Sequence, residues 1–73
     1  MTVEEAYQSY GAKKAYTGVN DNIVFLSRRL YGSNADIYLN ILRVLNFHVN
    51  WLNMQPGIVI YYLDPSVVND VVY

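Results

Sequence analysis

The segment that follows Ser33 constrains the fold most, because it predicts a helix with very little polar surface. Ser33 and Asp36 have the spacing of a capping box, which predicts that this helix begins directly after Gly32. Its polar side chains share one narrow stripe: Asp36, Asn40 and Arg43. Two apolar faces flank the stripe, formed by Ile37, Ile41 and Val44 and by Tyr38, Leu42 and Leu45. Two such faces need two packing partners. One is the core of this domain; the other is either a different chain or the same small domain, if it packs around both faces of the helix.

The chain has few other means of stabilising a small fold. With 73 residues it forms one domain and buries only about 60% of its unfolded surface. It has no cysteine for disulfides or thiolate metal sites, and its single histidine, His48, cannot form a zinc site alone. Charged residues make up only 15% of the chain, against about 25% in typical soluble domains. This shortage of charge favours the interpretation in which a partner covers the second face.

Charge and hydropathy exclude several classes of function. The net charge is −1, and the basic pairs at 13–14 and 28–29 are too few for a nucleic-acid footprint. No run reaches the roughly 18 apolar residues of a membrane span. The polar, acidic stretch MTVEEAYQSY has no feature of a signal peptide, so we expect a protein that stays in the cytoplasm or enters an assembly there.

The first 14 residues predict a short helix or an arm. Thr2 and Glu5 have the spacing of a capping box, and Gly11 would end the helix. One face of that helix would carry Val3, Ala6, Tyr7 and Tyr10. Because isolated helices of this length are marginal in water, an arm that becomes ordered on a partner is an equal alternative.

The next segment predicts a short strand followed by a helix. The strand is expected at 16–19, where Tyr-Thr-Gly-Val ends a mixed stretch. The capping residues Asn20–Asn22 then precede a helix that runs from Ile23 to the stop at Gly32. Arg28–Arg29 in its last turn compensate the helix dipole or, alternatively, contact an acidic partner.

The C-terminal third predicts a turn, a strand and a β-prone tail. Pro56-Gly57 fits the central positions of a type II turn, before an apolar strand at 58–63 that Asp64-Pro65 stops. The tail at 66–73 carries a single charge, which predicts either a strand added to another protein's sheet or a disordered end. Trp51, in the loop before the turn, would anchor an interface, stack on a sugar or cover the core.

Catalysis finds little support in the sequence. There is no cysteine, one histidine and no glycine-rich phosphate loop, and no nucleophile can be paired with a base and an orienting group. Asp21 and Asp36 are explained as helix-capping residues rather than as a carboxylate pair. We therefore expect a protein that is not an enzyme and that has no cofactor and no metal site.

From Tyr16 to Asp64 the order of predicted elements resembles a lysin motif (LysM) domain. The resemblance is carried by short matches in the same order and spacing: Tyr16-Thr17, Asn20-Asp21-Asn22, Leu30-Tyr31-Gly32, Asn46, Leu52, Pro56-Gly57 and Ile58-Val59-Ile60. It implies an α+β fold with a β-α-α-β domain at 15–64. An arm or short helix at 1–14 precedes this domain, and a tail at 65–73 follows it.

The stretch Leu30-Tyr31-Gly32-Ser33, before an apolar second helix, is similar to the LysM-like modules of phage tails. These include the tail protein X family and LysM-bearing baseplate wedge proteins. The resemblance implies a non-enzymatic adaptor that binds other tail or baseplate proteins, located in the virion tail after assembly in the host cytoplasm. It also implies terminal segments that become ordered only in the complex. The side chains expected to contact partners are Tyr38, Leu42, Leu45, Trp51, Val67, Val68, Val71, Val72 and Tyr73.

Secreted LysM domains supply the alternative, which is binding to the N-acetylglucosamine chains of peptidoglycan. The resemblance would then place the glycan at the loops before the first and after the second helix of the domain. The residues expected there are Asn20, Asp21, Asn22, Phe47, Trp51 and Asn53. This chain departs from that group because it has no Gly-Asp-Thr loop, no signal peptide, no catalytic neighbour and no repeat of the module.

Overall fold

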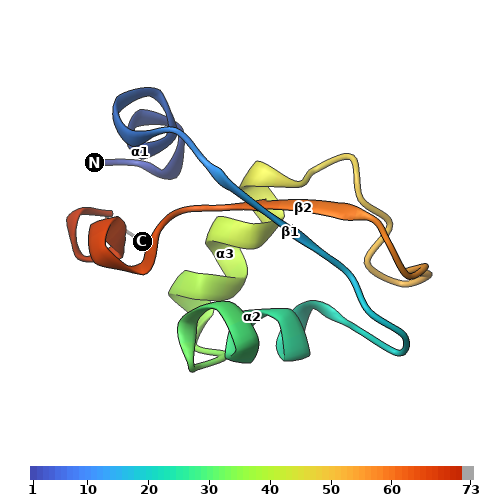
Figure 1. Ribbon diagram of the computed structural model, residues 1–73. Helices are drawn as coiled ribbons and strands as arrows, with labels where there is room; N and C mark the ends of the chain where they lie inside the picture. The colour runs from blue at the N-terminus through green and yellow to red at the C-terminus, as the bar shows by residue number, and fades with distance from the viewer. Residues whose placement is uncertain (72–73) are drawn as a thin grey trace.

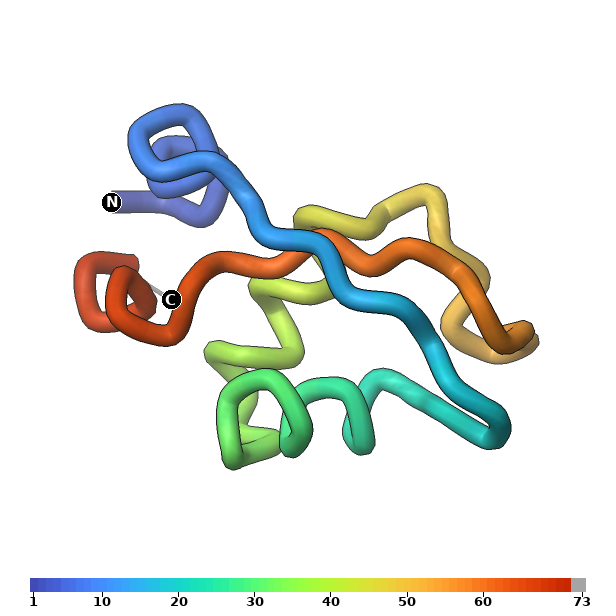
Figure 2. The backbone as a smooth tube through the Cα atoms, viewed as in Figure 1, coloured from blue at the N-terminus to red at the C-terminus, as the bar shows by residue number. Residues whose placement is uncertain are grey.

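The chain adopts an α+β fold, as expected, in a computed structural model that describes residues 1–71 (Figure 1). Its elements, in chain order, are α1 (Val3–Tyr10), β1 (Lys13–Tyr16), α2 (Ile23–Tyr31), α3 (Asp36–Leu45), β2 (Val59–Tyr62) and the 3-10 helix η1 (Pro65–Asp70). The strands form a two-stranded antiparallel sheet, and β2 is the strand that contacts α3. The backbone trace shows α1 and η1 side by side at one end of the molecule (Figure 2).

The register of the sheet runs from Lys13 opposite Tyr62 to Tyr16 opposite Val59. The first strand therefore lies earlier in the chain than the predicted segment at 16–19, so the predicted position is wrong. The strand ends at Tyr16 because the regular pairing of the two strands stops at Thr17, where a turn begins. Its hydroxyl donates to the Gln55 carbonyl at 2.6 Å and accepts from the Ile58 amide at 2.8 Å, so it joins the ends of the two strands.

Side-chain capping contacts confirm the predicted starts of the first two helices, and glycines with positive φ angles confirm their predicted ends. Thr2 and Glu5 form the reciprocal bonds of a capping box at the start of α1. The Asn22 side chain accepts from the Phe25 amide at 2.9 Å and caps α2. Gly11 and Gly32 end these helices with positive φ angles of 74° and 75°.

The predicted start of α3 is wrong. Ala35 occupies the N-cap position and makes no side-chain capping bond, so Asp36 is the first residue of the helix rather than its third. Ser33 instead accepts from the Ala35 amide at 3.1 Å, while its carbonyl receives the buried hydroxyl of Ser27 at 2.5 Å. The contact with α2 holds Ser33 in the link between the helices and keeps it out of a capping box.

Two separate clusters of buried side chains form the core, and α3 contributes to both. Ile41 packs with Val3, Ala6, Leu63 and Val68 in a cluster that we call the terminal core. Leu42, the next residue, packs with Leu26 and Ile60 in a cluster that we call the sheet core. Tyr31 packs against both clusters. Both apolar faces of α3 are therefore used within this one chain, as the second of the two sequence interpretations requires.

The segment after β2 forms η1 rather than a strand, which corrects the expected β-strand tail. The Asp64 carboxylate accepts from the backbone amide and the hydroxyl of Ser66, at 2.9 and 2.7 Å, and Pro65 starts the turn. Burial of Val68 in the terminal core fixes the helix there, against the β propensity of its valines. Val72 and Tyr73 lie outside the described residues.

The terminal segments fold onto each other, contrary to the expectation that they order only in a complex. Val3 and Ala6 of α1 are buried against the rest of the chain. The amino group of Met1 donates to the Asp70 carbonyl at 2.7 Å, and the Tyr10 hydroxyl donates to the Asp70 carboxylate at 3.2 Å. Within residues 1–71 no helix has the length and apolarity needed to cross a membrane.

Candidate functional site

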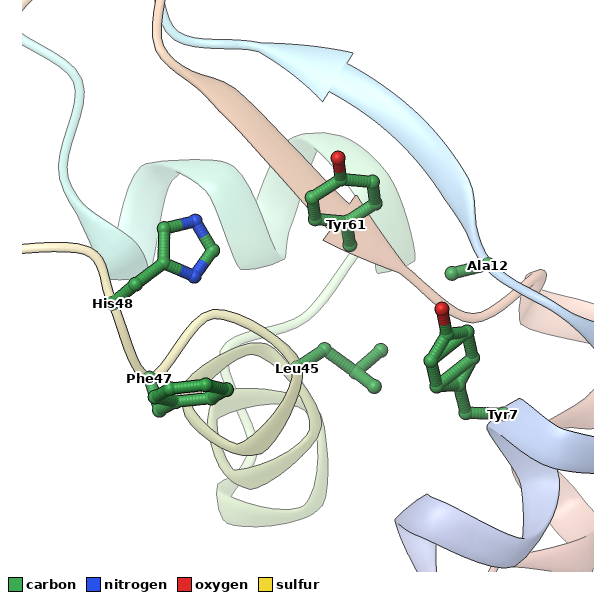
Figure 3. Close-up of a pocket in the computed structure, with 6 residues that line it drawn as sticks. All are labelled: Tyr7, Ala12, Leu45, Phe47, His48 and Tyr61. Carbon is green, nitrogen blue, oxygen red and sulfur yellow. The ribbon is translucent and has the colours of Figure 1, made fainter.

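An aromatic pocket of about 320 Å³ lies between α1, the C-terminal end of α3 and the sheet (Figure 3). It is lined by Tyr7, Ala12, Leu45, Phe47, His48 and Tyr61. Tyr7 comes from α1, Leu45 from the last turn of α3 and Tyr61 from β2, while Phe47 and His48 follow α3 directly. The volume is at the lower end of the range for small-molecule sites and suits one large side chain or a single sugar ring.

The fully buried side chain of Asn46 positions one wall of this pocket. Its Nδ2 donates to the carbonyls of Leu42 and Tyr61 at 2.8 and 2.7 Å, and its Oδ1 accepts from the Tyr61 amide at 2.8 Å. These bonds fasten the end of α3 to β2. The chain then leaves α3 with Phe47 88% exposed, and the Phe47 and His48 rings meet edge to face at 5.8 Å.

The lining of the pocket offers apolar surfaces and hydrogen-bonding groups that can bind a ligand. The rings of Tyr7, Phe47 and Tyr61 offer flat apolar surfaces, and the two tyrosine hydroxyls and His48 offer hydrogen-bonding groups. No carboxylate, serine or cysteine is among the lining residues. Among residues 1–71 no group of three or more His, Cys, Asp or Glu side chains could hold a metal ion.

The predicted partner-binding residues that the structure describes do not form one surface. Leu42 is fully buried and Val68 is 7% exposed, so both are corrected from contact residues to core residues. Val67 and Val71 pack against the terminal core. The fifth of this group, Tyr38, is half-buried and stacks on the ring of Tyr31, with 4.8 Å between ring centroids.

The two remaining described residues, Leu45 and Trp51, lie in different places. Leu45 lies in the wall of the aromatic pocket. Trp51 is half-buried and packs against the sheet core. Among the described residues of the predicted set, Leu45 is therefore the one that lines the pocket.

The residues predicted for glycan binding lie in three places. Thr17 brings the turn at 18–22 beside the turn at 53–57, so Asn20–Asn22 and Asn53 lie at one end of the sheet. Phe47 belongs instead to the aromatic pocket, and Trp51 packs on the sheet core. The predicted glycan residues therefore do not share one binding surface.

Two of these side chains already have structural partners. Asn22 caps α2, as described above. The Asp21 carboxylate accepts from the Gly18 amide at 2.6 Å and from Arg29 at 2.9 Å. Burial acts to raise the pKa of Asp21, but the bonds from Gly18 and Arg29 outweigh it and lower the pKa below its usual value. A ligand at this turn would have to compete with these bonds.

Large apolar side chains that lie open to solvent are the most unusual feature of the surface. The most exposed are Leu52 at 99%, Phe47 at 88%, Val19 at 77% and Tyr16 at 64%. Phe25, Tyr10 and Tyr7 are each about half exposed. The alternation of asparagines and large apolar residues after Asn46 could have indicated Leu52 and Phe47 as surface residues, because such a loop buries only some of its side chains. Nothing in the sequence pairs Tyr7 with Tyr61.

Comparisons with known proteins found no matching family model, no matching curated protein and no matching solved structure.

Proposed function

We propose that this chain is a non-enzymatic structural adaptor of a phage tail baseplate or a related contractile machine. It joins neighbouring subunits through its exposed apolar side chains. The resemblance of residues 16–64 to phage LysM-like modules supports the proposal, and so does the low content of charged residues. The observation that carries it is the exposure of Phe47 and Leu52, whose solvation as a free surface is unfavourable and is relieved by a neighbour.

The proposed contact surface differs from the one expected from sequence. It comprises the aromatic pocket and the loop after α3, because Val67, Val68 and Val71 and the second face of α3 are used inside the fold. Neighbouring proteins would insert apolar groups against Phe47 and Tyr61 and would cover Leu52. Tyrosine and phenylalanine are enriched at interfaces of this kind.

The proposal is tested by complementation of a phage that carries a nonsense mutation in the gene for this chain. We expect the double variant Phe47→Ser, Leu52→Ser to fold normally but to give incomplete baseplates by electron microscopy. Asn34→Ser is the matched control, because Asn34 is exposed and polar in the link between α2 and α3, and it should restore complete particles. Complete, infectious particles from the double variant would contradict the proposal.

Peptidoglycan binding is tested separately by titrating the labelled chain with N-acetylglucosamine oligomers. We expect no saturable amide shifts at Asn20–Asn22, because the side chains of Asn22 and Asp21 already make structural bonds. We also expect none at Phe47–Asn53, because Phe47 and Trp51 do not share one surface with that turn. Saturable shifts confined to these loops would replace the adaptor proposal with a cell-wall-binding function.

A further inference from the structure

The two edges of the sheet are finished in different ways. On β2, side chains take the place of a third strand. Asn46 bonds to both the amide and the carbonyl of Tyr61. Two residues further on, the Tyr31 hydroxyl accepts from the Leu63 amide at 3.0 Å and donates to the Leu63 carbonyl at 2.9 Å. The outer edge is therefore closed at Tyr61 of β2 and at Leu63, which directly follows the strand.

The outer edge of β1 is open at Lys14. Because Asn46 takes both backbone groups of Tyr61, the opposite residue Lys14 cannot be bonded to Tyr61. Thr17 indicates the same alternation of bonded and non-bonded positions. Its amide donates to the Ile58 carbonyl and its carbonyl accepts from the Gly57 amide, so the backbone of Thr17 faces the second strand. Hydrogen-bonded and non-bonded pairs alternate along an antiparallel ladder. The amide and carbonyl of Lys14 therefore point away from β2.

The open stretch is short and has a defined end. Tyr16 shares the outward phase of Lys14, and its carbonyl receives the Arg29 guanidinium at 3.0 Å. The amide of Tyr16 and both backbone groups of Lys14 have no hydrogen-bond partner within residues 1–71. A segment that pairs here can form about three backbone hydrogen bonds, which makes the site suitable for a short extended segment.

The positive charge of Lys14 at this edge indicates that the incoming segment carries a negative charge. Lys13 forms an ion pair with Asp64 at 2.5 Å, but no carboxylate of residues 1–71 lies within 4.0 Å of the Lys14 ammonium group. Lys14 instead lies over the Tyr61 ring, with Nζ 6.0 Å from its centroid. A lysine on an edge strand discourages pairing with another chain unless the incoming strand compensates the charge. An aspartate or glutamate opposite Lys14 does so.

We propose that the open edge of β1 binds an extended segment of another protein with an acidic residue opposite Lys14, as a third strand. This deepens the proposed function, on which it rests only in that the partner is a neighbouring protein. The acidic residue would exchange both backbone bonds with Lys14. A side chain two positions along would lie beside Ala12, at the rim of the aromatic pocket (Figure 3).

A second copy of this chain is the less suitable occupant of the edge. Antiparallel pairing of two β1 strands centred on Lys14 would place the two Lys14 side chains directly opposite each other. Like charges at directly opposed positions destabilise a strand pair. The electrostatics of the edge therefore favour a different protein with an acidic strand.

The test uses the capped peptide acetyl-Thr-Val-Glu-Val-Thr-amide with the isotopically labelled full chain. We expect saturable amide shifts centred on Ala12–Tyr16 and slower solvent exchange of the Lys14 and Tyr16 amides. The peptide with lysine in place of glutamate should bind about two- to fivefold more weakly, the effect of one cross-strand charge pair. A peptide N-methylated at glutamate should not bind, because it cannot donate to the Lys14 carbonyl.

Lys14→Pro is the matched protein variant. It removes the outward amide, while the ladder bonds of Lys13 and Ala15 stay in place, so the fold should persist and peptide binding should be lost. If the variant does not fold, the N-methylated peptide still decides the question.

Four results would overturn the proposal. These are no binding of the glutamate peptide at millimolar concentration, equal binding of its N-methylated form, shifts confined to the turn at 18–22, and self-association of the chain through β1. None of these results depends on whether the chain supports baseplate assembly, so the two proposals fail independently.

Discussion

Replacement of Asn46 by alanine tests how the end of α3 is fastened to the sheet. The side chain is fully buried, and both of its polar atoms are bonded. In the variant the Leu42 carbonyl keeps a donor, because the Asn46 amide also reaches it at 3.1 Å. The amide and carbonyl of Tyr61, in contrast, lose the partners that Asn46 supplies.

The expected loss of stability follows from these two backbone groups. A buried backbone group without a partner costs about 1–3 kcal/mol, so two such groups cost about 2–6 kcal/mol. Tyr61 is only half-buried, which lets water reach part of the site. We therefore expect Asn46→Ala to lower the free energy of unfolding by about 2–4 kcal/mol, a large share of the roughly 5 kcal/mol expected for so small a domain.

Urea unfolding followed by Trp51 fluorescence and by far-ultraviolet circular dichroism measures this loss. Asn34→Ala is the control, because Asn34 is exposed and its side chain makes no hydrogen bond within residues 1–71. The control should stay within about 0.5 kcal/mol of the parent chain. A loss below about 1 kcal/mol for Asn46→Ala would refute the argument, since it would mean that water replaces the side chain at little cost.

Three further predictions concern Thr17, Tyr31 and Asp21. Thr17→Val removes a hydroxyl that both donates to and accepts from the turn before β2, so we expect urea unfolding to show a loss of about 1–2 kcal/mol and amide exchange to quicken in that turn. Unchanged exchange would contradict this. Burial raises the pKa of Tyr31, so its contribution to stability is complete below the unfolded value near 10 and is lost as the pH rises through the raised value. Alkaline unfolding should therefore be less pH-dependent in Tyr31→Phe, and an identical profile would refute the assignment. The lowered pKa of Asp21 gives stability that is present above the usual value of 3.8 and is lost as the pH falls through the folded value. Thermal unfolding of Asp21→Asn across the acid range should lack that part of the loss, and an unchanged acid profile would count against it.

Helix ends and tight turns were predictable because neighbouring residues decide them. Thr2 with Glu5, Asn22 and Gly32 each act within a few residues of their own position, and all three predictions are confirmed. Gly57 has a φ of 81°, as the predicted type II turn requires. The α+β class follows from the same local patterns, since they place helices and strands in the correct order.

Predictions failed where contacts distant in the sequence override local preference. Ser33 has the spacing of a capping residue, yet a bond from Ser27 on the preceding helix holds it elsewhere. The valines after Pro65 favour a strand, yet burial of Val68 beside α1 stabilises η1. In both cases the deciding partner lies on another element, and a pattern read within one segment contains no information about it.

The candidate site was less predictable than the fold. The aromatic pocket joins Tyr7 to Tyr61, which are brought together by the packing of α1 and by the bonds of Asn46. The open edge of β1 depends on the phase of the ladder, and a shift of one residue would reverse which amides face outward. Sequence alone gives neither the packing nor the phase.

The placement of Ile41 and Leu42 in different cores limits how this protein can change over evolution. A larger side chain at either position turns or shifts α3, and the disturbance then reaches the other core through the same helix. Substitutions in the two cores should therefore be interdependent, so neutral drift in α3 should be slow and should occur in compensating pairs. Phe47 and Leu52, which lie exposed in the loop after α3, have no such constraint from core packing. If divergent descendants of this chain keep these two side chains constant, binding to a partner is the reason.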